Sequence, residues 1–460
     1  MSKNNSSFGI NNILKIISNA DAHVHFVGVG GAGMHPLFRL SSHFGISVSG
    51  SDAARGAVLD ALCRDGESVW CTAEGRAPLP DGTSLIVYSL AIDERDTELL
   101  EAESRGIPTV SRAEYLAALS HCFGHTVAVS GSHGKSTVTA MLSHIFEVAG
   151  KHPTTLSGAP LSGGGEGYHI GALDHLIYEA CEYKNSFLLP RPDIAVFLNL
   201  ELDHVDWFSS LEHISNAFLS AMNRAGRAVV NIDDPKIAEN ARKCYTPPIS
   251  FGKSADAYYR ITTLCDTPHA MRFSLSRDGL ALGEIFLPMI GSFNIYNATA
   301  ATVAALECGI PFDVCVRALS DFRGIGRRLE YIGEYNGRAV YYDYAHHPTE
   351  IAEGIKAIKS DTGGPVTVIF GPHTYSRTKG LWPEFVNSLC MAEHIILTEI
   401  SAIRESKIED ISSERLASEC GALVAGDGMD IRELADRTNG AIIIMGAADM
   451  SGVRKSLVPD

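Results

Sequence analysis

The sequence lacks the cysteine spacing typical of disulfide-rich or zinc-binding modules, and it lacks long apolar runs. Its ten cysteines are scattered between Cys63 and Cys420, and no two of them form a C-x-x-C pair. This distribution favours a reduced cytosol over a disulfide framework or a structural zinc site. There is no apolar run of about 18 residues, and the N-terminus has no apolar signal segment with a cleavage site. We therefore expect a cytoplasmic protein without membrane association.

Basic residues are also scarce. The 38 lysines and arginines are outnumbered by 54 acidic residues, which gives a formal net charge of −16. Proteins that bind duplex nucleic acid present a basic face, so this charge argues against nucleic-acid binding. It is compatible with a small anionic ligand held by backbone amides and a few basic side chains. The length of 460 residues is too great for one core and predicts two to four domains.

Three successive α/β units account for this length, with boundaries after residues 114 and 326. The first unit, 1–114, has four predicted strands: 23–29, 46–50, 85–88 and 108–110. The second, 115–326, contains the strand-like runs "DIAVFLNL" and "RAVVNI" and the helical pattern "NIYNATAATVAALECG". The third, 327–460, contains "AVYYDYAHH", "VTVIFGPH", "EHIILTEI" and "AIIIMG". Short apolar runs that end in polar or glycine residues are typical of buried parallel strands leading into functional loops.

The first of two glycine-rich loops is "GVGGAG", residues 28–33. It matches G-x-G-x-x-G between an apolar strand and a helical stretch, and Asp52 stands at the end of the next predicted strand. Such glycines let the backbone approach a diphosphate, and the helix N-terminus adds partial positive charge. The motif favours a dinucleotide or sugar nucleotide over an empty strand-to-helix turn, and it does not separate NAD from a UDP-sugar.

The second loop, "VAVSGSHGKST" at residues 127–137, differs from an ATPase phosphate loop at one position. The pattern G-x-x-x-x-G-K-[ST] requires glycine where this chain has Val129. The segment still places Gly134, Lys135 and Ser136 between an apolar strand and a helical pattern. Backbone amides for an anion, a lysine for terminal phosphates and a hydroxyl for Mg²⁺ are all supplied. We interpret it as a variant phosphate loop rather than a chance match.

Polar residues stand where two further apolar runs end. "LIYEACEY" places Glu179 at the end of one run, and "AVFLNLELDHVDW" places Asp203 and His204 at the end of another. Strand ends in such a sheet meet at one rim, which makes them suitable positions for Mg²⁺ ligands. Taken singly, Glu179 is more typical of a surface carboxylate, and His204 of a capping or core histidine. Beside a phosphate loop, the combination favours metal binding.

Taken in order, seven segments resemble those of the Mur ligase family, the ATP-dependent amide-bond ligases of peptidoglycan synthesis. They are "GVGGAGM", "SGSHGKST", "EACEY…NLELDHVD", "GSFNIYNATAA", "FRGIGRRLE", "DYAHHPTE" and "GPHTYSRT", and they cover nearly the whole chain. The resemblance implies an α/β fold of three domains. These are a Rossmann-like domain for a UDP-sugar, a central P-loop ATPase-like domain and a Rossmann-like domain for an amino acid. The family's phosphate loop begins its glycines late, which accounts for Val129.

The resemblance also implies a set of site residues. Those for the UDP moiety are Gly30, Gly31, Ala32, Gly33 and Met34, with Ser51 and Asp52 nearby. Those for ATP are Gly131, Ser132, His133, Gly134, Lys135, Ser136, Thr137, Asn294, Asn297 and the hinge residue Arg327. Those for Mg²⁺ are Ser136, Glu179 and His204. Those for the incoming amino acid are Tyr344, His346 and Arg377. Those expected to be catalytic are Lys135, Glu179, His204 and Arg377.

Three positions depart from common forms of the family. Phe293 stands where many alanine-adding members have histidine, but other Mur ligases carry phenylalanine there, so ATP binding is still expected. Cys181 replaces an acidic residue that commonly follows the Mg²⁺ glutamate. Thr374 replaces a second arginine, which leaves Arg377 as the main expected clamp for the carboxylate of the amino acid.

A missing lysine indicates the branch of the family. Members that add glutamate or a diamino acid use a carbamylated lysine after the D-H motif, and no lysine occurs between His204 and Arg224. The resemblance thus implies a monomeric or homodimeric enzyme that joins L-alanine to the lactyl carboxylate of UDP-N-acetylmuramate, with ATP and Mg²⁺, through an acyl phosphate. A tripeptide-recycling ligase is the alternative within the family. A nicotinamide-dependent dehydrogenase would leave the second loop unused, and a non-catalytic UDP-sugar-binding protein would be expected to lack Lys135 or the metal ligands.

Overall fold

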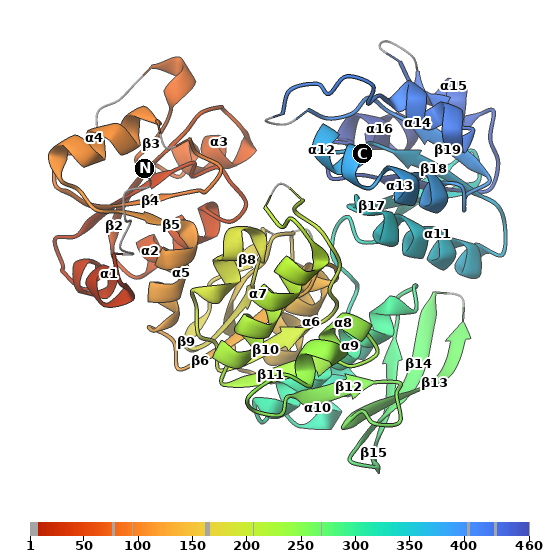
Figure 1. The fold of residues 1–460 in the computed structure, drawn as a ribbon, viewed down its shortest axis with the longest axis horizontal. Coiled ribbons are helices and arrows are strands. Elements are labelled where there is room, and N and C mark those ends of the chain that lie inside the picture. The colour runs from red at the N-terminus through yellow and green to blue at the C-terminus, as the bar shows by residue number, and fades with distance from the viewer. Residues whose placement is uncertain are drawn as a thin grey trace.

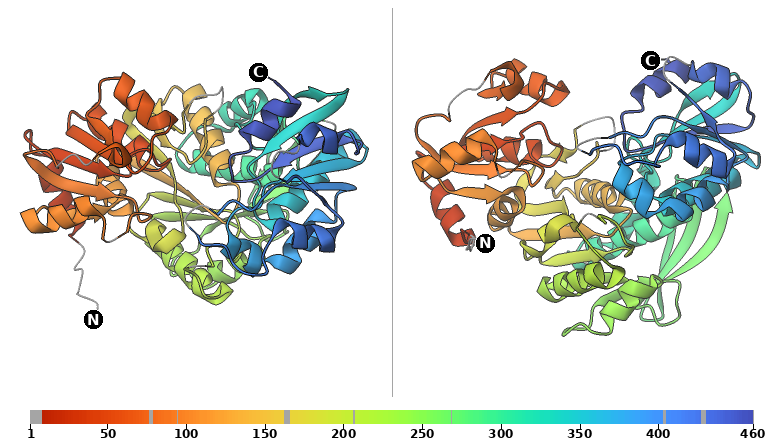
Figure 2. Two further views of the ribbon diagram at one scale, coloured as in Figure 1. Left: turned by 90° about the horizontal axis from the view of Figure 1, so that it is seen from above. Right: turned by 45° about the horizontal axis from the view of Figure 1, so that its top comes forward.

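The protein folds into three lobes, each built on its own sheet (Figure 1). The computed structural model describes residues 8–75, 79–93, 95–161, 166–205, 207–267, 269–402, 405–426 and 430–459. The first and third lobes lie against the central lobe, one on each side (Figures 1 and 2). Among the described residues, none of the helices combines the length and the apolar character needed to cross a bilayer.

The first lobe has a five-stranded sheet, in the order β3-β2-β1-β4-β5, in which all neighbours are parallel. Its strands are β1 (His23–Val27), β2 (Ser47–Asp52), β3 (Val69–Cys71), β4 (Thr83–Tyr88) and β5 (Thr109–Ser111). Its helices are α1 (Ile10–Ile17), α2 (His35–His43), α3 (Ala57–Arg64), the 3-10 turn η1 (Thr72–Glu74), α4 (Thr97–Arg105) and α5 (Arg112–Ser120). The central strand β1 is almost wholly buried and leads directly into the first glycine loop.

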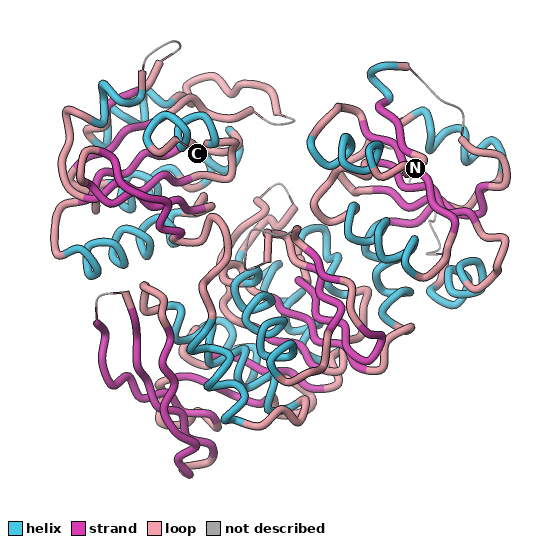
Figure 3. Tube along the Cα trace, turned by 180° about the vertical axis from the view of Figure 1, so that it is seen from behind, coloured by secondary structure: helices cyan, strands magenta, loops and turns pink. Residues whose placement is uncertain are grey.

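The central lobe has ten strands in the order β15-β14-β13-β12-β11-β10-β6-β9-β7-β8. The strands are β6 (His125–Ser130), β7 (Pro153–Leu156), β8 (Tyr168–His169), β9 (Ala172–Glu179), β10 (Ile194–Phe197), β11 (Arg227–Asn231), β12 (Ile249–Gly252), β13 (Tyr259–Thr267), β14 (Ala270–Arg277) and β15 (Leu280–Leu287). The helices are α6 (Lys135–Val148), the 3-10 turn η2 (Tyr183–Leu188), α7 (Leu211–Arg224), α8 (Pro235–Ala241), α9 (Phe293–Glu307) and α10 (Phe312–Asp321). In the sheet, the successive strands β7, β9, β6, β10, β11, β12 and β13 are all parallel to their neighbours. Strands β13, β14 and β15 form antiparallel hairpins. These hairpins lie beneath the third lobe, away from the first (Figures 1 and 3).

The third lobe has a six-stranded sheet in the order β16-β17-β21-β18-β19-β20. The strands are β16 (Glu330–Tyr335), β17 (Arg338–Asp343), β18 (Val366–Phe370), β19 (His394–Leu397), β20 (Leu423–Val424) and β21 (Ala441–Met445). The helices are α11 (Pro348–Thr362), α12 (Tyr375–Gly380), α13 (Trp382–Leu389), α14 (Ser413–Cys420), α15 (Ile431–Ala435) and α16 (Ser451–Leu457). Only β16 is antiparallel to its neighbour within this described sheet.

The predicted α/β class with three units is confirmed. The four strands predicted in the first unit are present as β1, β2, β4 and β5, and the edge strand β3 was not predicted. The domain boundaries remain predictions. The boundary after residue 114 falls inside α5, whose N-terminus is fixed by a capping box between Ser111 and Glu114. The boundary after residue 326 falls in the segment between α10 and β16.

Candidate functional site

The second glycine loop joins β6 to α6 and requires glycine at two positions. Gly131 and Gly134 have φ values of 151° and 85°, which L side chains rarely adopt. A Cβ on Gly134 would also lie 2.6 Å from Oδ1 of Asn297, and one on Gly131 would lie 3.0 Å from the Cβ of Leu198. Val129 belongs to the buried strand β6, between β9 and β10, rather than to the turn. The turn therefore starts later than the common pattern requires.

The backbone of this loop is held by the segment that follows β10. The backbone N–H of His133 donates a hydrogen bond to Oδ1 of Asn199 (2.8 Å). The side-chain N–H of Asn199 in turn donates to the backbone carbonyl of His133 (3.1 Å). The hydroxyl of Ser132 accepts the amide of Glu201 at 2.8 Å. These bonds fix the loop in the conformation that points the start of α6 toward a ligand.

Lys135, the first residue of α6, is paired with a buried carboxylate. Its Nζ lies 3.2 and 3.1 Å from the two carboxylate oxygens of Glu182, and it donates to the carbonyl of Gly131 at 2.5 Å. Burial opposes the charge of Lys135, but Glu182 outweighs it and raises the pKa of the lysine. The sequence analysis did not single out Glu182, although its place three residues after Glu179 in "EACE" was a usable signal.

The two predicted metal-binding side chains outside the loop lie at different points around this ion pair. Glu179 ends β9, and its Oε1 accepts the hydroxyl of Ser157 (2.7 Å) and the amide of Gly158 (2.6 Å). His204 has φ of 52° and places its Nε2 3.8 Å from Oε1 of Glu182. The structure thus brings His204 to Glu182, and through Glu182 to Lys135.

The donor set suits Mg²⁺. The hydroxyl of Ser136 is buried at the start of α6, and the charges of both Glu182 and Glu179 act on Lys135. Oxygen donors of this kind are those that Mg²⁺ prefers. Burial, reinforced by Glu182, raises the pKa of the Cys181 thiol, so this position adds no negative charge at neutral pH.

The loop of the first lobe is closed by bonds to the end of β2. The amides of Gly28 and Val29 both donate to the carbonyl of Ser51, at 2.8 and 2.9 Å. The amide of Gly30 donates to Oδ2 of Asp52 at 2.9 Å. The other predicted residues of this loop are Gly31, Ala32, Gly33 and Met34, of which the first two are exposed. The predicted glycines and Asp52 are therefore together at one strand-to-helix turn.

The side chain of Ser51 faces away from this loop. Its hydroxyl donates at 2.5 Å to the buried carboxylate of Glu98, which also lies 3.3 Å from Nε2 of His25. Only the backbone of Ser51 therefore serves the loop. Arg112, which the sequence analysis missed, lies against the loop instead, because a Cβ on Gly33 would be 3.1 Å from its Cδ. Its position directly after β5 was a usable signal.

A cavity of about 260 Å³ lies between the central and third lobes. It is lined by the loop residues Gly134 and Thr137, by Phe293, Asn294 and Asn297 of α9, and by Arg328 and Glu350 of the third lobe. Asn297 donates to Oδ1 of Asn294 at 2.9 Å, and Asn294 donates to the carbonyl of Ile290 at 2.7 Å. The two predicted asparagines thus line the same cavity as the phosphate-loop residues Gly134 and Thr137.

Arg327 is directed into the third lobe. Its guanidinium donates to the carbonyls of Gly446 (2.7 Å) and Ala448 (3.3 Å) and lies over the ring of Tyr344, 4.7 Å from the centroid. The neighbouring Arg328 lines the cavity in its place. The role predicted for Arg327 at ATP remains a prediction, and Arg328 is the arginine that this geometry presents to a cavity ligand.

The three residues predicted to contact an amino acid lie together at the interface with the central lobe. His346 and Tyr344 pack ring against ring, with centroids 5.2 Å apart. Burial, with the nearby Arg377, lowers the pKa of His346 to about 4, so its ring is neutral at neutral pH. Nε and Nη2 of Arg377 donate to Oδ1 of Asp203 in the central lobe, at 3.3 and 3.1 Å. Burial opposes the ionisation of Asp203, but Arg377 outweighs it and holds the pKa of that carboxyl well below its usual range.

Three regions of the chain match family profiles, in the same order as the lobes. Residues 23–123 match the Mur ligase family catalytic domain, residues 129–305 the Mur ligase middle domain, and residues 327–449 the Mur ligase glutamate ligase domain.

Named relatives cover almost the full length. The UDP-N-acetylmuramate–L-alanine ligase of Aquifex aeolicus is 36% identical over 436 residues, which are 93% of this chain and 95% of that protein. The ligase of the same name from Acetivibrio thermocellus is 34% identical over 455 residues, 95% of this chain and 96% of that protein.

Solved structures share the fold. The UDP-N-acetylmuramate–alanine ligase of Thermotoga maritima superposes with a TM-score of 0.77 at 22% identity, over 94% of this chain and 97% of that one. A murein peptide ligase of Psychrobacter arcticus gives 0.72 at 23% identity, over 95% and 98%.

The Lys135–Glu182 pair leads to a chemical prediction. The substitution Glu182→Gln should lower the pKa of Lys135, because it removes the carboxylate that most strongly favours the charged form. More of the free amine would then be present at mildly alkaline pH. We expect acetic anhydride to acylate Lys135 several-fold faster, measured by peptide mass spectrometry. Glu179→Gln, whose charge acts on the lysine more weakly, should give a smaller increase, and equal rates in all three proteins would contradict the pairing.

Proposed function

This chain belongs to the Mur ligase family, and we propose that it joins L-alanine to the lactyl carboxylate of UDP-N-acetylmuramate, in peptidoglycan precursor synthesis. ATP would be converted to ADP and phosphate. The proposal is supported by relatives that carry this activity in their names and match more than nine-tenths of the chain at 34–36% identity. It is also supported by a phosphate loop, a cavity beside that loop and a cluster of amino-acid-binding candidates at one interface.

The observation that carries the proposal is a short path from the phosphate loop to the third lobe. Lys135 contacts Glu182, and Glu182 lies 3.8 Å from His204. The residue directly before His204 in the chain, Asp203, is paired with Arg377 of the third lobe at 3.1 Å. A carboxylate activated at the loop and an amine held by the third lobe would therefore meet at this interface, as an amide ligase requires.

In the first step, an oxygen of the lactyl carboxylate attacks the γ-phosphorus of ATP, ADP leaves, and an acyl phosphate forms. Lys135 offsets the negative charge of the transferring phosphoryl group, and the loop amides orient it. Ser136, Glu179 and His204 would hold Mg²⁺, with Glu182 beside them. When bound, Mg²⁺ would neutralise charge on the phosphate oxygens.

In the second step, the neutral amine of L-alanine attacks the acyl carbon, phosphate leaves with the bonding electron pair, and the nitrogen loses a proton. Arg377 would hold the α-carboxylate, because a planar guanidinium binds a carboxylate through two parallel hydrogen bonds. His346 is neutral beside it and can accept a hydrogen bond from the amine. Contact between the lobes around the bound substrates would keep out water, which would otherwise hydrolyse the acyl phosphate.

Other functions are less well supported. A dehydrogenase would leave the phosphate loop between β6 and α6 unused. A non-catalytic binding protein would not need Lys135, Glu179 and His204, all of which are present around Glu182. For the tripeptide-recycling branch, the likeness to a murein peptide ligase is one of fold alone.

The substrate can be tested directly. We expect phosphate release from ATP in the presence of UDP-N-acetylmuramate and L-alanine, and much less with glycine, L-serine or the recycled tripeptide, each added separately. A continuous phosphate assay measures all four. Turnover with the tripeptide but not with L-alanine would assign the chain to the recycling branch.

Removal of the loop lysine should abolish the chemistry and spare the sugar-nucleotide site. Lys135→Ala is expected to lower kcat by roughly 10²–10³-fold or more, since it removes charge stabilisation in the phosphoryl transfer. Binding of UDP-N-acetylmuramate, measured by calorimetry, should be unchanged because the first lobe holds that ligand. Lys243→Ala is the matched control, since Lys243 is an exposed lysine of the same lobe that pairs only with Glu239 among the contacts described. Retention of substantial turnover would show that the loop does not act on ATP.

The clamp assigned to Arg377 predicts a substrate-specific effect. Arg377→Lys keeps the charge but loses the planar fork, so the KM for L-alanine should rise by the equivalent of roughly 1–3 kcal/mol, about 5- to 150-fold. The KM for UDP-N-acetylmuramate should change little. Arg432→Lys, at an exposed arginine of the third lobe, is the control. Equal small changes in both KM values would leave Arg377 as a partner of Asp203 and nothing more.

A further inference from the structure

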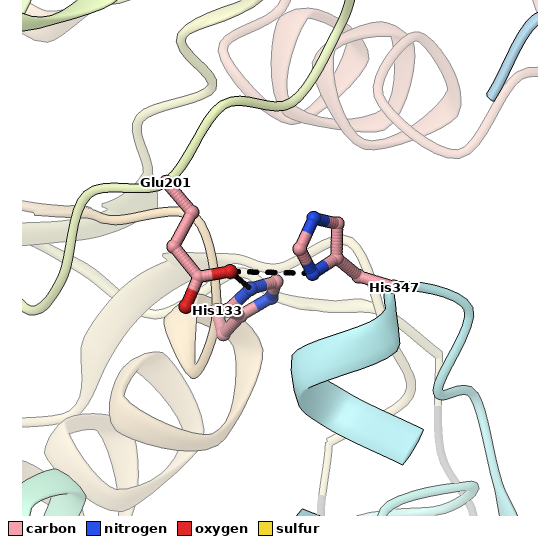
Figure 4. A group of neighbouring side chains, drawn as sticks. All are labelled: His133, Glu201 and His347. Carbon is pink, nitrogen blue, oxygen red and sulfur yellow. Dashed lines mark hydrogen bonds and ion pairs between the residues drawn. The ribbon is translucent and has the colours of Figure 1, made fainter. Parts of the chain in front are cut away.

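Three side chains from two lobes direct their ligand atoms to one place at the interface (Figure 4). His133 and Glu201 belong to the central lobe, and His347 is the N-cap of α11 in the third. Nε2 of His133 and Nδ1 of His347 each lie 3.3 Å from Oε2 of Glu201. All three ligand atoms lie within 4.8 Å of one another.

These separations match those of metal ligands. Nitrogen and oxygen ligands stand about 2.0–2.1 Å from a tetrahedral zinc ion, so neighbouring ligands are roughly 3.3–3.4 Å apart. Both distances to Oε2 of Glu201 fall at this value. Two imidazoles and one carboxylate also form a common set of protein ligands for a catalytic or open metal site, with further positions left for water.

The hydrogen bonds of His347 show which ring nitrogen carries the lone pair. Its Nδ1 accepts a hydrogen bond from the backbone N–H of Thr349 at 3.4 Å, so the lone pair is on Nδ1. The other nitrogen, Nε2, is buried and has no hydrogen-bond partner among the described residues. The lone pair on Nδ1 thus lies 3.3 Å from Oε2 of Glu201, an arrangement of two electron-rich atoms that a bound cation would stabilise.

The surrounding contacts are those that usually support metal ligands. The second ring nitrogen of His133 lies 3.2 Å from the carboxylate of Glu350, and the hydroxyl of Thr349 donates to Glu201 at 2.7 Å. Carboxylate and hydroxyl groups in such positions orient ligands and raise their basicity. Arg328, 3.6 Å from Glu350, offsets part of the remaining negative charge.

The donor types select the class of metal. A pair of imidazole nitrogens favours Zn²⁺, Co²⁺ and Ni²⁺ over Mg²⁺, which prefers a site made mainly of oxygen ligands and retains water. The carboxylates of Glu201 and Glu350 lie 3.3 and 3.2 Å from the two ring nitrogens of His133, and a divalent cation would offset their negative charge.

We propose that His133, Glu201 and His347 form a binding site for a zinc-class divalent cation that ties the phosphate loop to the third lobe. Binding itself is independent of the proposed ligase function. Its consequence rests on that function: a metal that bridges the two lobes holds the interface closed, so it should inhibit turnover even when Mg²⁺ is saturating.

The test uses the full-length protein after removal of metals by a chelator. Co²⁺ should give the visible absorption of a tetrahedral or five-coordinate site, and Zn²⁺, titrated against a chromophoric chelator, should bind one ion per chain at this site. His347→Gln should weaken Zn²⁺ binding by more than about 100-fold. Thr349→Val, which leaves all three ligands in place, should weaken it by roughly tenfold.

The control is His269→Gln. His269 also contacts the third lobe, through Asp361 at 3.1 Å, but it belongs to no such ligand group among the described residues. The His269→Gln variant should therefore bind Zn²⁺ with the same affinity as the unsubstituted protein. Equal Zn²⁺ affinity in the unsubstituted protein and His347→Gln would overturn the site and leave an ion-pair network only. If the unsubstituted protein had no ligase activity, the proposed function would fail while the cobalt spectrum still decided the metal site.

Discussion

Hydrogen bonds between the phosphate loop and the segment after β10 fix the geometry on which the rest of the site depends. Asn199 bonds both the N–H and the C=O of His133, and the amide of Glu201 donates to the hydroxyl of Ser132. Both segments leave adjacent parallel strands, β6 and β10, which are buried. The rigid sheet therefore sets the loop, and the loop sets the direction in which Lys135 leaves the start of α6.

The same segment connects the lobes. Within a few residues of Asn199 it supplies Glu201, which contacts His347 and Thr349, then Asp203, which pairs with Arg377. The loop that would hold phosphate is thus linked, through Glu201, to the lobe that would hold the amino acid. Residues 199–203 thus connect the two sites through one short stretch of backbone.

Features encoded in short stretches of sequence could be predicted. The glycine loops follow from local conformation, since only glycine adopts the φ of Gly131 and Gly134 readily, and the strands follow from apolar runs. Charged partners could not be predicted in the same way. Glu182 meets Lys135 and Asp203 meets Arg377 across 47 and 174 residues of sequence, and such pairs leave no local pattern.

The orientation of Ser51 was not predicted, although the alternation of side chains along a strand could have indicated it. Neighbouring side chains in β2 point to opposite faces of the sheet. With Asp52 bonded to the loop amide of Gly30, Ser51 must face the other side, where it meets Glu98. Arg327 and Arg328 differ for another reason. Adjacent residues in a turn can point either way, and the positive φ of Arg327, 58°, directs it into the third lobe.

The buried ion pair of Lys135 and Glu182 makes anion binding at the loop an exchange. Any anion that takes the lysine must displace a carboxylate that already satisfies it, so the gain in free energy is the difference between two ion pairs. Chloride and other monovalent ions gain little from such an exchange. A polyphosphate, which also accepts hydrogen bonds from several loop amides, gains much more. The internal carboxylate thus sets a threshold, and the loop discriminates among the anions of its surroundings by charge and by the number of contacts they can make.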